Sequence, residues 1–215
     1  FSWEKNVTSG KGWSYGAEFL LQKKSGKLSG WIGYTLSWTQ MQFDSLNFGN
    51  KFYARYDRRH DISLVGIYKL RKESAENGED GITLSATWVY GTGNAITLPI
   101  SSFIAPNHNP AGSDMGGYWN SQEYSEKNAY RMAAYHRLDF GIQFHRTKKH
   151  GVRTWEFSIY NVYSRQNPYF YFVESNNGRN FLTQVSLFPI LPSFSYSFKF
   201  MKTKARKVDK VVYEQ

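Results

Sequence analysis

The residues of this sequence best suited to chemistry are four consecutive ionisable side chains, Arg58-Arg59-His60-Asp61. An imidazole beside a carboxylate can transfer protons, so the cluster could serve acid–base catalysis. However, consecutive residues of a straight strand point to opposite faces, so His60 and Asp61 are not expected to act as a pair on one strand. No Ser-His-Asp, Glu-x-x-His or glycine-rich phosphate motif appears elsewhere. We expect that the chain is not an enzyme.

Four other histidines lie further along the chain. They are His108, His136, His145 and His150. They lack the spacing of metal ligands, and carboxylates are not clustered beside them. The chain has no Cys, which removes thiolate ligands and disulfides. The sequence therefore predicts no metal site and no cofactor.

A group of aromatic and polar side chains could bind a ligand. It consists of Tyr118, Trp119, Asn120 and Tyr124, within a long segment (91–134) rich in turn-forming residues and expected to be irregular. Aromatic faces beside polar groups suit a carbohydrate or a peptide. Alternatively, these aromatics pack within the loop or lie at a membrane interface.

Charge gives little support for a nucleic-acid partner. The formal net charge is +10, but the basic residues are spread over strand ends and turns such as KKSGK and RTKKHG. Without a basic face or a known binding motif, we do not expect nucleic acid to bind.

The elements that would position these residues are strands, because apolar and polar residues alternate over most of the chain. The clearest case is FSYSFKF at 194–200, in which every second residue is aromatic. We predict seven strands, at 11–22, 28–42, 60–72, 82–90, 135–147, from 155 into the NVYSRQNP segment, and at 183–200. In the last strand the apolar positions change from odd to even, which predicts a one-residue bulge within 188–192.

The connections between these strands alternate in length. Short turns follow the first, third and fifth strands, and longer loops follow the second, fourth and sixth. A soluble β-sandwich has no reason to segregate its loops, whereas a transmembrane β-barrel has short turns on one side and long loops on the other. Aromatic residues make up 18% of the chain, and no window holds the roughly 20 apolar residues that a spanning helix needs. The fold class predicted is all-β, an antiparallel transmembrane β-barrel segment.

Several segments carry a family resemblance. They are SGWIGYTLSWTQMQFD, FYARYDRRHDISLVGIYKL, TWVYGTGNAITLP, YHRLDFGIQF, WEFSIYNVYSRQNPYFYF and QVSLFPILPSFSYSFKF. Together they cover most of 11–200, and they resemble the C-terminal part of a TonB-dependent outer membrane receptor of the type with a carboxypeptidase-like N-terminal extension. The resemblance implies a 22-stranded barrel, a plug and a TonB box, in the outer membrane of a Gram-negative bacterium.

The same resemblance implies a function and partners. The protein would import a scarce nutrient, such as a glycan, a peptide or a metal chelate, using energy from the TonB complex. Its partners would be outer membrane lipid, the TonB complex and the remainder of the transporter. A surface lipoprotein could be a further partner. Seven strands cannot close such a barrel, so we expect the plug, the TonB box and the other strands to lie upstream or in another chain.

The resemblance also divides the chain. Residues 1–200 would form the C-terminal barrel segment, and 201–215 a basic periplasmic tail that could instead pair with another subunit. The terminal aromatics Phe194, Tyr196, Phe198 and Phe200 would form the barrel insertion signal.

Three other functions remain open at the level of sequence. A passive or adhesive outer membrane barrel would lack a plug and a TonB box, and a soluble carbohydrate-binding β-sandwich would need no detergent. An outer membrane protease is a more distant alternative.

Overall fold

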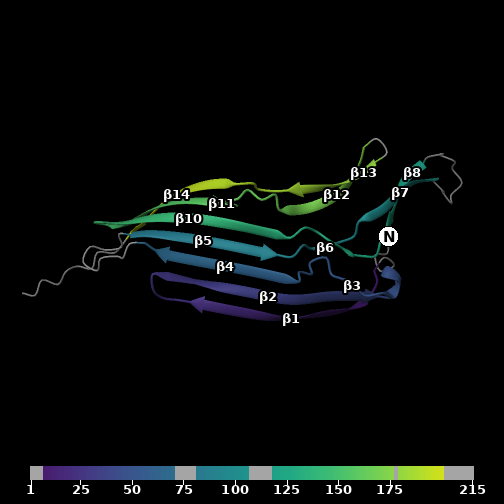
Figure 1. The fold of residues 1–215 in the computed structure, drawn as a ribbon, viewed down its shortest axis with the longest axis horizontal. Coiled ribbons are helices and arrows are strands. Elements are labelled where there is room, and N and C mark those ends of the chain that lie inside the picture. Colours follow the sequence, from purple (N-terminus) through teal and green to yellow (C-terminus); the bar gives the residue numbers. More distant parts are fainter. Residues whose placement is uncertain (1–6, 71–80, 107–117, 177–178, 201–215) are drawn as a thin grey trace, which may run out of the picture.

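A computed structural model describes residues 7–70, 81–106, 118–176 and 179–200. Its main feature is one antiparallel sheet in the strand order β1-β2-β4-β5-β10-β11-β14 (Figure 1). The strands are β1 (Gly10–Lys23), β2 (Leu28–Phe43), β4 (His60–Lys69), β5 (Gly81–Gly91), β10 (Tyr135–Lys148), β11 (Gly151–Tyr160) and β14 (Leu191–Phe200). These correspond to the seven predicted strands, and the all-β antiparallel class is confirmed. The third strand ends at Lys69, short of the predicted 72, and residues 71–72 lie outside the described part.

Two ends of the sheet differ in what lies beyond them. At the end called the turn end, β1 connects to β2 and β10 connects to β11 within a few residues. At the opposite end, called the loop end, the chain forms additional short strands (Figure 1). They are β3 (Phe52–Tyr53), β6 (Ala95–Ile96), β7 (Pro99–Pro106), β8 (Tyr118–Tyr124), β9 (Tyr130–Arg131), β12 (Pro168–Asn176) and β13 (Arg179–Ser186), with one 3-10 turn at Asn47–Gly49.

The prediction of an irregular 91–134 segment is wrong. Strand β6 pairs with β9 and β7 pairs with β8, so the segment folds back on itself as two nested strand pairs. At its base Gly93 lies so close to the Met132 carbonyl that a Cβ atom would collide with it. A glycine is therefore needed where these two chain segments meet.

The prediction of a single last strand with a one-residue bulge is also wrong. Strand β13 pairs with β12 and ends at Ser186, and β14 begins separately at Leu191 against β11. Between them Phe188 has a positive φ of 53°, and its carbonyl accepts a hydrogen bond from Asn161 Nδ2 at 3.2 Å. The chain thus turns between two strands, and the two prolines near this turn cannot donate ladder hydrogen bonds.

The predicted extension of the sixth strand through NVYSRQNP is wrong for a related reason. Strand β11 ends at Tyr160, and the next residue, Asn161, has a φ of 55° and is buried. Its side chain donates to the Arg165 carbonyl at 2.9 Å and accepts from the Arg165 N–H at 3.1 Å. These bonds replace the ladder of a strand with a closed turn.

The strands pair in a register that places apolar residues opposite apolar residues throughout the sheet. Ile32 lies opposite Leu64, Leu64 opposite Trp88, and Trp88 opposite Leu138. Ile142, Phe157 and Phe194 continue the same face over β10, β11 and β14. We call this side the apolar face. The polar face carries rows such as Gln143, Glu156 and Ser195.

The sheet has no hydrophobic core against its apolar face in the described residues. Buried apolar side chains are Phe52, Ala54, Ala95, Met132 and Val152, of which all but Val152 lie beyond the loop end. On the apolar face, by contrast, Phe19 is 63% exposed and Phe194 is 55% exposed. Among the described residues, no helix has the length and apolar character needed to cross a membrane.

Candidate functional site

The most enclosed charged group of the described residues is Asp57, whose side chain is 0% exposed at the loop end. Its Oδ1 accepts the Thr39 N–H at 2.5 Å. Its Oδ2 pairs with the Arg131 guanidinium, and Arg131 Nη1 also donates to the Asp57 carbonyl at 2.6 Å. Arg59 lies 3.8 Å from the same carboxylate. Buried charges are tolerated when they are paired and hydrogen-bonded in this way.

Aromatic rings cover the two guanidiniums that face Asp57. Arg59 lies over Trp38 at 4.6 Å and over Tyr53 at 5.4 Å, and Arg131 lies over Tyr53 at 4.7 Å. Such contacts suit the planar guanidinium group. The arrangement ties β3 and β9 to the end of β2 and serves as a structural anchor.

In the Arg58-Arg59-His60-Asp61 cluster, His60 and Asp61 contact different residues. His60 Nδ1 lies 2.9 Å from the Tyr34 hydroxyl, whereas Asp61 pairs with Arg58 at 3.5 Å. His60 lies opposite Leu36 and Asp61 opposite Thr35, so the two residues occupy opposite faces. The expected separation of this pair is thus observed.

The histidines of the described part do not converge either. His136 Nδ1 lies 2.8 Å from the Tyr163 hydroxyl, and His145 Nδ1 lies 3.0 Å from Thr154 Oγ1. The described residues contain no group of three side chains arranged to hold a metal ion. His108 lies outside the described residues.

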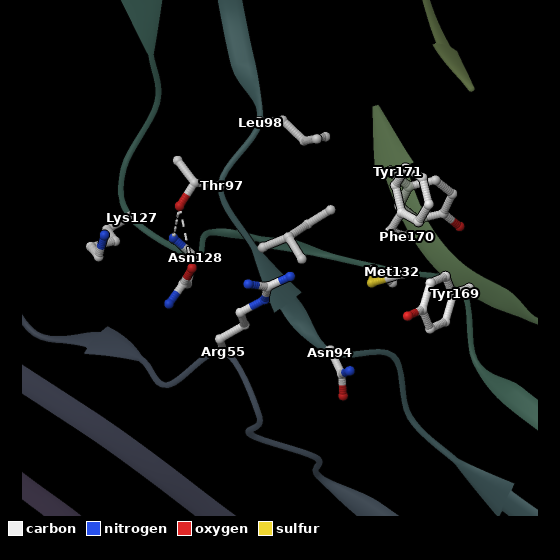
Figure 2. Close-up of a pocket in the computed structure, with 11 residues that line it drawn as sticks. Arg55, Asn94, Thr97, Leu98, Lys127, Asn128, Met132, Tyr169, Phe170 and Tyr171 are labelled. Atoms are coloured by element: carbon white, nitrogen blue, oxygen red, sulfur yellow. Dashed lines mark hydrogen bonds between the residues drawn. The ribbon is translucent and has the colours of Figure 1, made fainter. Parts of the chain in front are cut away.

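A cavity of about 390 Å³ opens beyond the loop end (Figure 2). Four separate chain segments line it: the segment after β3, the segment around β6, the segment around β9, and β12. The lining residues are Arg55, Asn94, Ile96, Thr97, Leu98, Lys127, Asn128, Met132, Tyr169, Phe170 and Tyr171. In Figure 2 the rings of β12 lie on one side and the Thr97–Asn128 pair on the other, with Arg55 between them.

Asn128 and Thr97 form the frame of this cavity. The Asn128 N–H donates to Thr97 Oγ1 at 2.9 Å, and the Thr97 hydroxyl donates to Asn128 Oδ1 at 3.2 Å. Asn128 Nδ2 donates to the Tyr53 carbonyl at 2.8 Å. Asn128 has a φ of 54°, a conformation that asparagine tolerates better than most residues. These polar groups hydrogen-bond to one another and hold the cavity wall in place.

A second cavity of about 500 Å³ lies on the other side of Met132. It is lined by Tyr53, Arg59, His60, Thr92, Gly93, Arg131, Met132 and Ala134. Both of its arginines already face Asp57. The two cavities therefore differ in charge, because Arg55 and Lys127 of the first cavity have no carboxylate partner among the described residues.

The predicted ligand-binding residues lie in β8. Tyr124 is 56% exposed, and its hydroxyl donates to Gln122 Oε1 at 2.8 Å. It lines neither of the two cavities described above. The side chains of Tyr118, Trp119 and Asn120 lie outside the described part, so ligand binding by this group stays a prediction.

The predicted insertion residues share the apolar face at the edge strand β14. Trp155 lies 5.2 Å from Phe194 and 4.6 Å from Tyr196, and Phe198 lies 4.9 Å from Phe200, measured between ring centroids. Phe200 is 78% exposed. The predicted basic tail at 201–215 lies outside the described residues.

Sequence reasoning missed the anchor and the cavity. Asp57 and Arg131 are far apart along the chain, and no local pattern links them. The aromatic run PYFYF at 168–172 was the available signal for one cavity wall. Comparisons with protein-family models, with curated proteins and with solved structures found no match to this chain.

Proposed function

We propose that this chain forms part of the wall of a transmembrane β-barrel in the outer membrane of a Gram-negative bacterium. In this proposal it is the C-terminal barrel portion of a TonB-dependent transporter that imports a scarce nutrient. The open edges at β1 and β14 then pair with the remaining strands of a 22-stranded barrel. The plug and the TonB complex supply the gating.

The observation that carries the proposal is the apolar face, which continues over seven strands with no second layer of described residues against it. Large rings such as Phe19, Phe157 and Phe194 are each about half exposed or more. Water is a poor environment for so wide an apolar surface, whereas hydrocarbon is a good one.

Strand length supports the same proposal. The seven strands contain 10 to 16 residues each, whereas strands of soluble proteins commonly have about 5 or 6. A tilted strand crosses the hydrocarbon layer with about 9 to 11 residues. Each of these seven strands is therefore long enough to span the hydrocarbon layer.

A soluble β-sandwich is less well supported by the same observations. A sandwich needs a second sheet packed about 10 Å from the first. The other sheets of the described residues have two strands each, and they lie beyond the loop end (Figure 1). They do not form a layer over the apolar face.

Single cysteines provide the test, because the chain has no Cys of its own. Glu126→Cys lies in the loop-end region and Lys24→Cys in the β1–β2 turn, and both side chains are exposed. In intact cells making the full-length protein, a membrane-impermeant maleimide should label Glu126→Cys but label Lys24→Cys only after permeabilisation. Equal labelling of both, or recovery of the protein without detergent, contradicts the barrel.

Energy dependence distinguishes the transporter from other barrels. Nutrient uptake that stops when the TonB complex is deleted supports active import. Uptake or adhesion that is unaffected by this deletion supports the passive or adhesive barrel instead.

The insertion role of β14 can be tested separately. Phe198→Ala combined with Phe200→Ala should strongly reduce the amount of folded protein in the outer membrane, because these rings are proposed to form the assembly signal. The measurement is the heat-sensitive mobility of the folded protein on a gel. Ser195→Ala combined with Ser197→Ala changes the opposite face of the same strand and should assemble normally. Normal assembly of the phenylalanine double variant removes the insertion role.

A further inference from the structure

The cations at the loop end fall into two groups. Arg59 and Arg131 face Asp57, Arg58 pairs with Asp61, and Arg137 pairs with Asp139 at 2.9 Å. By contrast, Arg55 and Lys127 have no carboxylate within ion-pair distance among the described residues, although both line the cavity of Figure 2.

The wall of this cavity has cationic donors and lacks acidic acceptors. No Asp or Glu is among its described lining residues. The Asn94 side-chain oxygen is already used by Arg58 Nε at 3.1 Å, and the Asn128 amide is used within the frame. The charged groups left for a ligand are the guanidinium of Arg55 and the ammonium of Lys127, which only donate hydrogen bonds, and the Tyr169 hydroxyl lies beside them on the cavity wall.

The opposite wall offers rings. Tyr169 is 64% exposed and Phe170 is 41% exposed, and the buried Met132 also lines the cavity. Figure 2 shows the three consecutive aromatic residues of β12 across the cavity from Lys127. A volume of about 390 Å³ falls within the range of small-ligand sites. It suits a molecule of one or two ring units.

We propose that this cavity binds a carboxylate-bearing small molecule. Its anionic group meets Arg55 and Lys127, and its ring or carbon skeleton packs on Tyr169 and Phe170. A guanidinium binds a carboxylate through two parallel hydrogen bonds, which gives orientation as well as attraction. Arg55 and Lys127 are exposed, and a neutral sugar would gain no ionic attraction from either of them. That such a molecule is the imported substrate rests on the proposed transport function, whereas the binding itself does not.

Titration calorimetry on the full-length protein in detergent tests the inference. The probes are digalacturonate, citrate and the neutral disaccharide cellobiose. Binding of digalacturonate alone identifies an acidic sugar as the source of the carboxylate, and binding of citrate alone identifies a chelating acid. Either result supports the proposal, and affinity should fall as salt rises because the contact is ionic. Tighter binding of cellobiose than of both acids, or no binding of either acid, overturns it.

Substitutions locate the site. Arg55→Ala should weaken binding of the acid at least about ten-fold, since hydrogen bonds to charged groups are among the stronger ones. Lys127→Ala should weaken it several-fold, and Arg55→Lys should fall between Arg55→Ala and the unchanged protein. Lys149→Ala removes the same charge at the turn end and should leave the affinity unchanged.

A circular dichroism melt of each variant separates lost binding from lost folding. Equal affinity of Arg55→Ala and Lys149→Ala, both folded, overturns the assignment of the site. Calorimetry tests acid binding, and maleimide labelling tests the barrel. The two measurements are independent, so failure of one proposal can be distinguished from failure of the other.

Discussion

The sheet exposes the large side chains of its apolar face, whereas the loop end encloses most of the buried side chains in the described part. Leu64 and Trp88 of the sheet lie opposite each other on neighbouring strands and are only partly buried. Asp57 at the loop end is enclosed by a backbone N–H and a guanidinium, with a second guanidinium nearby. The sheet and the loop end are therefore stabilised by different kinds of interaction.

This difference shows where each region obtains its free energy. Backbone ladders hold the sheet together, and its apolar side chains gain most when lipid surrounds them. The loop end lies outside that layer in the proposed function, so it needs internal ion pairs and hydrogen bonds. A substitution should therefore have a large effect only when it disturbs the interaction on which its own region depends.

The largest effect is expected on the apolar face. Phe140→Arg places a charge where lipid is proposed, and it should lower the free energy of unfolding by up to about 4 kcal/mol. Gln143→Arg is the matched control on the polar face, where Gln143 already contacts Glu156 at 3.1 Å. Urea unfolding of the full-length protein in lipid vesicles measures both. Equal losses in the two variants contradict the distinction between the faces.

A smaller loss is expected from the anchor. Arg131→Met removes the closest cation from a fully buried carboxylate and should cost about 3 kcal/mol, the lower end for breaking a buried ion pair. The loss is limited because Arg59 remains 3.8 Å from Asp57.

Arg58→Met provides the comparison for the anchor, because Arg58 and Asp61 are 43% and 45% exposed. An exposed pair contributes about 1 kcal/mol or less. Amide hydrogen exchange at β3 and β9 reports on this region directly. If Arg58→Met increases exchange as much as Arg131→Met, the anchor does not stabilise the loop end.

A loss smaller than that from Arg131→Met is expected at the boundary between the regions. Asn161→Ala removes the side-chain bonds to Arg165 and Phe188 and should cost about 2 kcal/mol, because the Arg165 and Phe188 carbonyls lose this donor. Asn161→Gly removes the same bonds but adopts the observed φ of 55° more easily.

The glycine variant should therefore be the more stable of the two in thermal unfolding. A stability of Asn161→Ala equal to that of the unchanged protein would show that these bonds do not hold the turn before β14.

The sheet was predictable from the sequence because its signal is local. Alternation with a period of two places the residues of each strand on one of two faces, and FSYSFKF makes this plain. The apolar register of 183–187 was assigned to the same strand as 194–200 because periodicity alone cannot distinguish a bulge from a turn. The deciding feature is the hydrogen bond between Asn161 and Phe188, which the sequence pattern does not contain.

The loop end was not predictable, because its interactions are not local in sequence. The Asp57–Arg131 pair and the cavity at Arg55 depend on contacts between segments that are distant in sequence. Arg58-Arg59-His60-Asp61 was noticed because its members are adjacent, although two of its cations turn out to serve different carboxylates. Adjacent charges are easy to see in a sequence, whereas their partners are set by the fold.

The pairing of β6 with β9 has a consequence for how the sheet can form. Strand β10 must find β5 across all the residues between Gly91 and Tyr135, and closing a long loop costs more entropy than closing a short one. Once Ala95 lies opposite Arg131, the two ends of that loop are already neighbours. The β12–β13 hairpin does the same between β11 and β14. The β6–β9 pair and the β12–β13 hairpin thus shorten the loops that must close before β5 meets β10 and β11 meets β14, which favours faster folding.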